Sequence, residues 1–334
     1  MKSSKLTTEV SITPSDWKIN LQSKIATVGS CFADVLGQQL HDHKLSVLNN
    51  PFGTVFNPLT ISKILDLALE SKSPSAGLYL QNLDKIWLHH DFHSSQWAMT
   101  KEELETELKK KLDDLKNFIQ KADVLVITLG TAYAYRQKST NVLVGNCHKV
   151  PADKFIKELL HPDQILIPFE QLVHKLKSFN RNLRIILTVS PVRHTKDTLT
   201  LNQVSKSILR LVCHRLSEKF KQIDYFPSYE IMIDELRDYR FFEADLIHPN
   251  KVAEDYIFRT FATAYMDSGA QDFMKDWEGI QQMINHRPQH GLTDSQLKLL
   301  KTAKAKMNAL AEVVNVDREL KEIDARIKEF PHFK

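Results

Sequence analysis

The fold is decided by the stretch Ile25-Ala26-Thr27-Val28-Gly29-Ser30-Cys31-Phe32-Ala33. Residues 25–28 form a short apolar run typical of a buried strand, and apolar residues at helical spacing follow from Phe32 to Leu40. A strand that turns into a helix within two residues points free backbone N–H groups and the positive end of the helix dipole at the edge of the sheet. Open α/β sheets place their chemistry at this edge. The same pattern also fits an ordinary turn in which Ser30 caps the helix.

Strands and helices alternate along the rest of the chain. The β-branched runs at 122–130 and 183–189 are typical of parallel strands buried on both faces, and 223–226 predicts a further short strand. Helical spacing predicts helices over 60–69, 104–118 (behind a capping box of Thr100 and Glu103), 155–160, 169–179, 199–221, 229–236 and 251–266. This alternation predicts an α/β protein, a three-layer α/β/α fold with a mostly parallel central sheet.

Length and charge narrow the class of protein. The 334 residues suffice for one large α/β domain, and 45 Lys and Arg against 41 Asp and Glu leave an interspersed net charge of +4. We therefore expect no nucleic-acid partner and no membrane association. Cys31, Cys147 and Cys213 cannot form a disulfide framework, which favours a reducing compartment. Residues 1–6 lead into polar sequence with no apolar signal core, so a cytoplasmic location is expected.

The composition changes near the C-terminus, where residues from 293 to 330 are rich in Lys, Glu, Ala and Leu. Apolar residues recur there at steps of three and four, which predicts a helix or helical hairpin with a coiled-coil-like stripe. Packing on the chain's own domain and self-association both fit this stripe. We expect an α/β domain over residues 1–290 and a C-terminal helical segment over 291–334.

Four stretches with chemistry-bearing side chains follow predicted strands or lie on loops beside them. They are Gly29-Ser30-Cys31, the loop around Gly53, Gly130-Thr131-Ala132 and Asp245-Leu246-Ile247-His248-Pro249. The three-residue spacing in the last stretch allows a tight turn in which the Asp245 carboxylate fixes the tautomer of the His248 ring. Alone this motif is a weak signal. Paired with a nucleophile turn near the other end of an α/β domain, it supplies the second half of a triad.

The stretch Gly29-Ser30-Cys31-Phe32-Ala33 resembles the signature for which the GSCFA family is named, a branch of the SGNH (GDSL-type) hydrolase superfamily. The resemblance extends over most of residues 25–265. It runs through Asn50-Pro51-Phe52-Gly53-Thr54, Asp91-Phe92-His93-Ser94, Leu129-Gly130-Thr131-Ala132, Ser190-Pro191-Val192-Arg193-His194 and Asp245-Leu246-Ile247-His248-Pro249. It does not cover the C-terminal helical segment. The resemblance implies a three-layer α/β/α fold and chemistry on esters or acyl groups.

The resemblance also implies a nucleophile in the opening turn. In the superfamily this is a serine two places after the glycine, and without a gap that position is Cys31, while Ser30 takes the place of the usual aspartate. A slip of one residue would make Ser30 the nucleophile. Serine is a favoured N-cap, and it would leave Cys31 in the first turn, where the helix dipole lowers a thiol pKa. This favours Cys31, for which burial as a small inert residue is the structural alternative.

The other superfamily positions match in part. The resemblance assigns His248 as general base, Asp245 as its orienting partner and Gly53 as a backbone donor to the oxyanion. The third motif, headed by Gly130, places Ala132 where an asparagine side chain is usual. A missing donor argues against ordinary esterase activity, because one such donor contributes a factor of about a hundred or more. The candidates to replace it are Asn57, Asn50 and Thr131.

Four further residues are expected beside a substrate. Asp91 and His93 lie in a histidine-rich stretch whose spacing allows metal ligation, but no matching run of ligands appears elsewhere. We therefore expect hydrogen bonds to a substrate or within the structure, with no metal and no other cofactor. Arg193 and His194 follow a predicted strand and are expected to form a wall of the site, where an arginine could bind a carboxylate or phosphate.

Two classes of function stay open. The first is an enzyme that hydrolyses an ester or thioester through an acyl-enzyme, or transfers the acyl group to an acceptor on the same triad. The second is a non-catalytic protein that binds a glycan or acylated ligand in a degenerate pocket. The intact Asp245–His248 motif favours the first, and the missing asparagine favours the second. The expected partner is a small-molecule or glycan ester. A dinucleotide-dependent enzyme is disfavoured, because no G-x-G-x-x-G follows the first strand.

Overall fold

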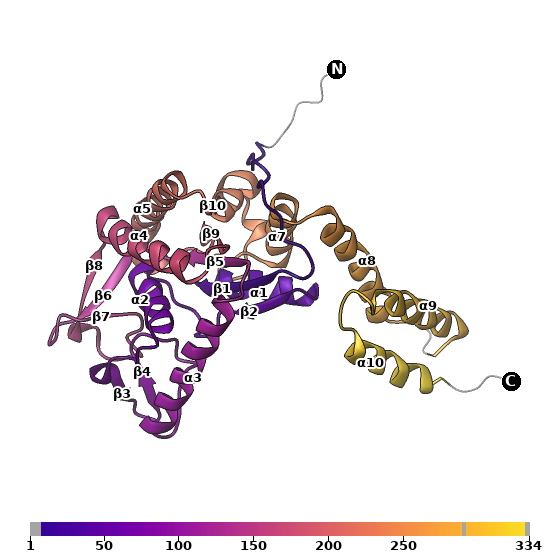
Figure 1. The fold of residues 1–334 in the computed structure, drawn as a ribbon, viewed down its shortest axis with the longest axis horizontal. Helices are drawn as coiled ribbons and strands as arrows, with labels where there is room; N and C mark the ends of the chain where they lie inside the picture. Colours follow the sequence, from indigo (N-terminus) through magenta and orange to yellow (C-terminus); the bar gives the residue numbers. More distant parts are fainter. Residues whose placement is uncertain (1–7, 289–291, 331–334) are drawn as a thin grey trace, which may run out of the picture.

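The centre of the computed structural model, which describes residues 8–288 and 292–330, is a five-stranded parallel sheet (Figure 1). The strands are β1 (Lys24–Gly29), β2 (Ser46–Asn49), β5 (Val124–Leu129), β9 (Arg184–Val189) and β10 (Ile223–Phe226). Their order is β10-β9-β5-β1-β2. The chain goes from β1 to β2 on one side and then to β5 on the other, so the direction of winding reverses beside β1. The carboxyl ends of β1, β5 and β9 consequently lie in a row at one edge of the sheet, where open α/β sheets bind ligands.

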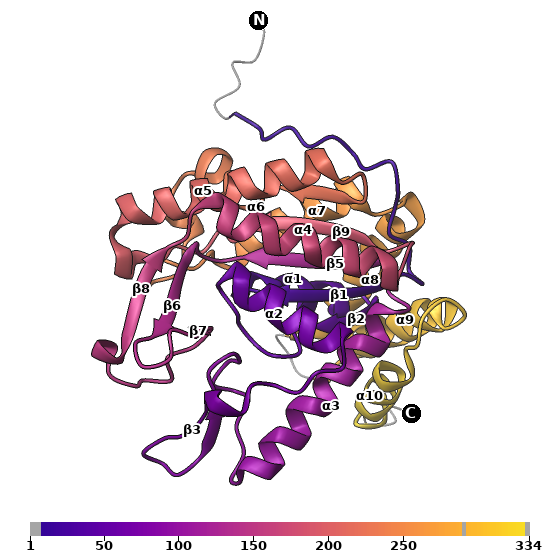
Figure 2. The same ribbon diagram turned by 60° about the vertical axis from the view of Figure 1, so that its left-hand side comes forward.

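Helices cover both faces of this sheet (Figure 2), so the predicted three-layer fold is confirmed. Helices α2, α3, α4 and α5 pack on the face that buries Ala26, Leu125 and Leu187. Helices α1 and α7 pack on the opposite face, against Ile25 and Val124. The helices are α1 (Cys31–Asp42), α2 (Pro58–Leu69), α3 (Lys101–Ile119), α4 (Pro162–Phe179), α5 (Thr198–Lys219) and α7 (Lys251–Tyr265). Alternate residues of each central strand thus serve two separate cores.

Two small antiparallel sheets project from the carboxyl-end side of the central sheet (Figure 2) and were not predicted. One pairs β3 (Tyr79–Gln81) with β4 (Trp87–His89), and the other has the order β7-β6-β8, with β6 at Tyr133–Gln137, β7 at Leu143–Val144 and β8 at Phe155–Leu159. The prediction of a helix over 155–160 is therefore wrong. These residues pair antiparallel with β6, from Phe155 opposite Gln137 to Leu159 opposite Tyr133. This pairing with a segment distant in sequence outweighs a local helical pattern of six residues.

Short helical turns complete the α/β domain. They are a three-residue helix α6 (Ser228–Glu230), a π-helical turn at Ile231–Leu236, and 3₁₀ turns at Ala76–Leu78, Ala152–Lys154, Thr195–Asp197 and Tyr239–Phe241. The first two lie where the sequence predicts a helix over 229–236.

The C-terminal residues form a helical unit beside the α/β domain (Figure 1). The predicted hairpin is present as α9 (Asp294–Leu310) and α10 (Asp317–Lys328), and it packs on α8 (Ser268–Asn285). Trp277 of α8 and Met307 of α9 lie in one core with Ile323 of α10. Much of the apolar stripe is thus buried within the chain, and self-association through these helices stays a prediction. The predicted boundary at residues 290 and 291 lies outside the described residues.

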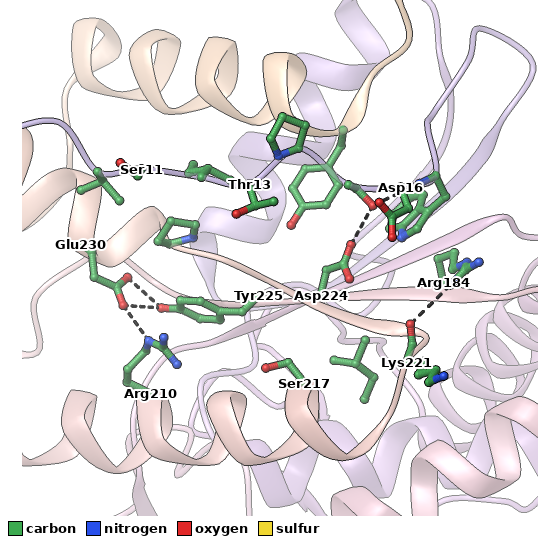
Figure 3. A pocket seen from close by; sticks show the side chains of 18 residues that line it. Ser11, Thr13, Asp16, Arg184, Arg210, Ser217, Lys221, Asp224, Tyr225 and Glu230 are labelled. Carbon is green, nitrogen blue, oxygen red and sulfur yellow. Dashed lines mark hydrogen bonds and ion pairs between the residues drawn. The ribbon is translucent and has the colours of Figure 1, made fainter.

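The N-terminal segment passes along β10, the edge strand of the sheet. The Ser15 hydroxyl donates to the Asp224 carboxylate (3.0 Å). A cavity of about 840 Å³ lies between this segment and α5, and Figure 3 shows Tyr225 and Arg210 converging there on the Glu230 carboxylate. Because an uncovered edge strand is a template for pairing with other chains, the segment protects β10.

Among residues 8–288 and 292–330, no helix has both the length and the apolar character needed to cross a bilayer. Residues 1–6, from which the absence of a signal segment is predicted, lie outside the described residues.

Candidate functional site

The turn after β1 brings the backbone close to β5. Gly29 has φ +135°, and a Cβ atom at this position would lie 2.1 Å from the Thr128 carbonyl oxygen, so only glycine fits. The Ser30 N–H donates to the same carbonyl oxygen (3.0 Å). The Gly29 N–H donates to the side-chain oxygen of buried Asn50 (3.0 Å). These contacts fix the point at which α1 begins, with Cys31 as its first residue.

Ser30 and Cys31 differ in exposure. Ser30 is the N-cap of α1, as predicted, but it is completely buried, and its hydroxyl makes neither a capping bond nor any other hydrogen bond among the described residues. Cys31 is half-buried. Of the two candidate nucleophiles, only Cys31 therefore reaches the surface of the turn.

The pKa of the Cys31 thiol is raised to about 11. Burial is the largest cause. The Lys206 ammonium opposes it, the Asp34 carboxylate adds to it, and the N–H groups of Phe32 and Cys31 lower the pKa slightly. The helix start lowers this pKa as expected, but the expectation that the thiolate is favoured is wrong, because desolvation of the thiolate outweighs the backbone donors. The thiol is protonated at neutral pH, so a role as nucleophile requires a base.

The Asn50–Gly53 turn lies beside the nucleophile turn and against His93. Gly53 has φ +70°, and a Cβ atom there would lie 2.8 Å from the Cβ atom of His93. The Gly53 N–H donates to the Asn50 carbonyl oxygen (2.8 Å), so the predicted oxyanion donor is engaged within its own turn. The His93 ring bonds its near neighbour Ser95 through Nδ1 (3.0 Å). The structure thus places His93 next to Gly53, while the role of each stays a prediction.

A buried lysine connects the ends of β5 and β9. Lys206 is 1% exposed, and its ammonium donates to the carbonyl oxygens of Gly130 (2.8 Å) and Ser190 (2.7 Å). Burial lowers its pKa to about 7, while Cys31 raises it slightly. No motif in the sequence points to Lys206. A signal was still present, because Lys206 falls on the buried stripe of α5 with Asn202, Leu209 and Cys213.

The candidates to replace the missing asparagine are engaged elsewhere. The Asn57 side chain caps α2 through Oδ1 and donates from Nδ2 to the Tyr133 carbonyl oxygen (2.8 Å). The Thr131 hydroxyl bonds Ser205 (3.0 Å), and the N–H groups of Gly130 and Thr131 both donate to the Phe56 carbonyl oxygen. These bonds hold the loops after β2 and β5 together, and the side chains of Asn57 and Thr131 are already engaged in them.

The Asp245–His248 turn forms the predicted hydrogen-bonded pair. His248 Nδ1 lies 2.7 Å from Asp245 Oδ2, and Asp245 Oδ1 accepts the N–H groups of Ile247 (2.8 Å) and His248 (3.0 Å). These bonds hold the pKa of Asp245 down to about 2. His248 is half-exposed, and no described residue bonds its Nε2 atom. Nor is His248 hydrogen-bonded to Cys31 or to Ser30.

Arg193 attaches this turn to the end of β9. Its N–H donates to the Ile247 carbonyl oxygen (3.2 Å), and its guanidinium donates to the Leu246 carbonyl oxygen (3.2 Å). The guanidinium also lies 3.9 Å from the centre of the Phe242 ring. Arg193 therefore positions the loop that carries His248, which sequence alone does not indicate.

His194 and Asp91 are both buried groups. Burial lowers the pKa of His194 to about 3, helped by the charges of Lys206 and His248, and its ring lies edge-on to Phe56. Asp91 lies deep in the fold and forms an ion pair with Lys63 (2.7 Å), although burial still raises its pKa. Asp91 is thus held as a structural ion pair. Across the residues described, no three His, Cys, Asp or Glu side chains are grouped to hold a metal ion.

A cavity of about 440 Å³ lies at this edge of the sheet. Its lining includes Asn57, Thr131, Arg193 and His194, together with Ile247, the residue before His248. Four of the residues predicted to contact a substrate therefore line one space. Tyr133, Tyr135 and Lys157 of the β7-β6-β8 sheet form its outer wall.

The buried Lys206 predicts a pH dependence of stability. Its pKa is about 7 in the folded chain and about 10.4 in an unfolded one. Above pH 7 the unfolded chain therefore binds more protons at this residue, so its contribution to the free energy of unfolding rises with pH. We expect the wild type to gain stability relative to Lys206→Met between about pH 7 and 8. Urea unfolding of both proteins at three pH values measures this, and a constant difference would contradict it.

Solved structures with a related arrangement are remote in sequence. An α/β hydrolase enzyme from the metagenome of Lake Arreo, Spain, is 12% identical, with a TM-score of 0.39, over 74% of this chain and 96% of that one. A family 3 carbohydrate esterase from Clostridium thermocellum is 9% identical, with a TM-score of 0.35, over 76% and 98%. One from Talaromyces cellulolyticus is 11% identical, with a TM-score of 0.33, over 76% and 99%. At such TM-scores these similarities do not bear on activity. Curated proteins gave no match.

Two family models match this chain. Residues 277–329 match the C-terminal domain of GSCFA domain proteins, so the expectation that the family resemblance stops before the C-terminal helices is wrong. Residues 24–261, which include the β1 turn and the Asp245–His248 turn, match the GSCFA family. This chain belongs to the GSCFA family.

Proposed function

We propose that this protein hydrolyses an ester or thioester through a triad of Cys31, His248 and Asp245. The observation that carries the proposal is the 2.7 Å bond between Asp245 and His248 Nδ1. This bond fixes the ring so that Nε2 is free to accept a proton, which is the arrangement that a general base requires. The pair is attached through Arg193 to the end of β9, and Cys31 follows β1 at the same edge of the sheet.

Exposure favours Cys31 over Ser30 as the nucleophile. Ser30 is completely buried, whereas Cys31 is half-buried at the first position of α1. A nucleophile has to reach the carbonyl carbon of a substrate. The N–H groups of Cys31 and Phe32 already favour negative charge on the thiol, and we assign them as donors to the oxyanion as well. Because the N–H groups of Gly53, Gly130 and Thr131 already donate to carbonyl oxygens, we expect the N–H groups of Cys31 and Phe32 to be the main donors to the oxyanion.

The reaction proceeds in two stages. In the first, Cys31 Sγ attacks the acyl carbon while its proton passes to His248 Nε2, and Asp245 stabilises the imidazolium. The proton then goes to the leaving alcohol or thiol as its bond to the acyl carbon breaks, which leaves a thioester on Cys31. In the second stage His248 takes a proton from water, whose oxygen attacks the thioester. The carboxylic acid leaves and the thiol regains its proton.

The test is the turnover of a panel of activated acyl esters and thioesters. We expect Cys31→Ala to lower kcat/KM to the background rate of hydrolysis, because no other described nucleophile lies at the turn surface. Ser30→Ala, with an intact thiol, is the matched control and should retain activity on the same substrates. Activity that survives Cys31→Ala and disappears with Ser30→Ala would move the nucleophile to Ser30. Equal activity in wild type and both variants would exclude the triad, and turnover at the background rate in all three would favour a binding protein.

A further inference from the structure

The 440 Å³ cavity beside the His248 turn carries an excess of positive charge. We infer that this cavity selects a substrate that carries an anionic group, a carboxylate or a phosphate, at a distance from the bond that is cleaved. This inference rests on the proposed function. The charged side chains that line this cavity, and the ion pairs that some of them form, support the inference.

One wall of the cavity belongs to the candidate catalytic site. Thr54 follows the Asn50–Gly53 turn, and Ile247 precedes His248, so the predicted oxyanion turn and the His248 turn both border the space. Thr131 lines it from the end of β5. Cys31 and His248 themselves lie outside the lining, so we place the acyl carbon beside the cavity and the rest of the substrate within it.

The opposite wall carries the charge. Lys157, Arg193 and Lys196 line the cavity, and Asp197 is its only carboxylate. Asp197 forms an ion pair with Lys157. Arg193 donates to neutral carbonyl groups, and no described carboxylate pairs with Lys196. Two positive charges thus stay uncompensated, since burial leaves neighbouring His194 with a pKa of about 3 and hence neutral.

Two aromatic rings hold the ammonium group of Lys157 in place. The Lys157 ammonium lies 4.5 Å from the ring centre of Tyr133 and 5.8 Å from that of Tyr135. These rings and the Asp197 carboxylate hold the lysine in place. An anionic group entering the cavity would meet Lys196, which has no carboxylate partner, and Arg193, whose guanidinium is bonded only to a neutral carbonyl group among the described residues. Lysine and arginine side chains of this kind recognise carboxylates and phosphates.

The first arm of the test compares two matched substrates, the mono-4-nitrophenyl ester of suberic acid and its neutral monomethyl ester, whose chain is too long for the carboxylate to attack its own ester. We expect wild type to prefer the anionic ester in kcat/KM by about fivefold or more at low salt, which one favourable charge pair supplies. High salt should reduce the preference. Lys196→Glu should abolish it, whereas Lys138→Glu, an equal charge change outside the cavity lining, should leave it intact. Equal kcat/KM values for the two esters in wild type would overturn the inference.

The second arm separates this inference from the proposed function. Calorimetric titration of wild type with succinate and with inorganic phosphate measures anion binding without turnover, and the two titrations distinguish carboxylate from phosphate. Binding of either anion that weakens in Lys196→Glu but not in Lys138→Glu supports the inference even if no ester is hydrolysed. Ester hydrolysis with no charge preference and no anion binding would leave the triad standing and overturn the anionic substrate.

Discussion

Replacing His248 with alanine is expected to lower kcat/KM for an activated ester by about 10²- to 10⁴-fold, the usual contribution of a positioned general acid–base group. Activity should depend strongly on His248 because the Cys31 thiol, with its pKa raised to about 11, is protonated at neutral pH. Without His248 the triad has no base to accept this proton. Steady-state kinetics on the panel of activated esters measures the loss.

The matched control for this substitution is His214→Ala. His214 is half-exposed on α5, where it pairs with Glu218 away from the candidate site, so its loss should leave kcat/KM unchanged. Asp245→Asn tests the orienting bond. It should lower kcat with little change in KM, because an amide no longer stabilises the imidazolium. If His248→Ala and His214→Ala are equally active, His248 is not the base.

Replacing Gly29 with alanine is expected to destabilise the fold by about 3 kcal/mol or more. The new Cβ atom would lie 2.1 Å from the Thr128 carbonyl oxygen, and φ is +135°, which side-chain-bearing residues rarely adopt. Relief requires β1 to move away from β5 at the centre of the sheet, where both strands are buried. Urea unfolding gives the difference in the free energy of unfolding.

Gly279→Ala is the control for this change. Gly279 lies within α8, and a Cβ atom there would meet no atom within 4 Å. Alanine should therefore stabilise the chain by about 0.5–1 kcal/mol through helix propensity. The two glycine substitutions are thus expected to act in opposite directions. A loss below 1 kcal/mol at Gly29 would show that the turn is not held as the structure has it.

Local signals in the sequence predict much of this fold. The strand ending at Gly29 and the helix after Ser30 are both present, and the Thr100–Glu103 capping box forms as expected. Such features depend on neighbours within a few residues. The strand at Phe155–Leu159 depends instead on hydrogen bonds with β6, so its own pattern misled the prediction. The outer wall of the cavity was missed for the same reason.

In the candidate site, too, contacts between near neighbours could be predicted from the sequence, and contacts between distant segments could not. The Asp245–His248 bond could be predicted because three residues of spacing suffice to make it. The positions of Lys206 and Arg193 depend on loops from three separate strands, and no short motif encodes them. The thiol pKa was also misjudged. The sequence shows a helix start at Cys31 but not the burial that raises the pKa.

The central claim, that Cys31 carries the acyl group, is tested most directly by mapping a covalent intermediate. Wild type and Cys31→Ala would be mixed briefly with an excess of an activated ester, quenched in acid and digested, and the peptide containing residues 30 and 31 examined by mass spectrometry. The account predicts an added acyl mass on Cys31 that neutral hydroxylamine removes, as expected for a thioester, and no adduct in Cys31→Ala. An acyl group on Ser30, or turnover without any adduct on this peptide, would contradict it.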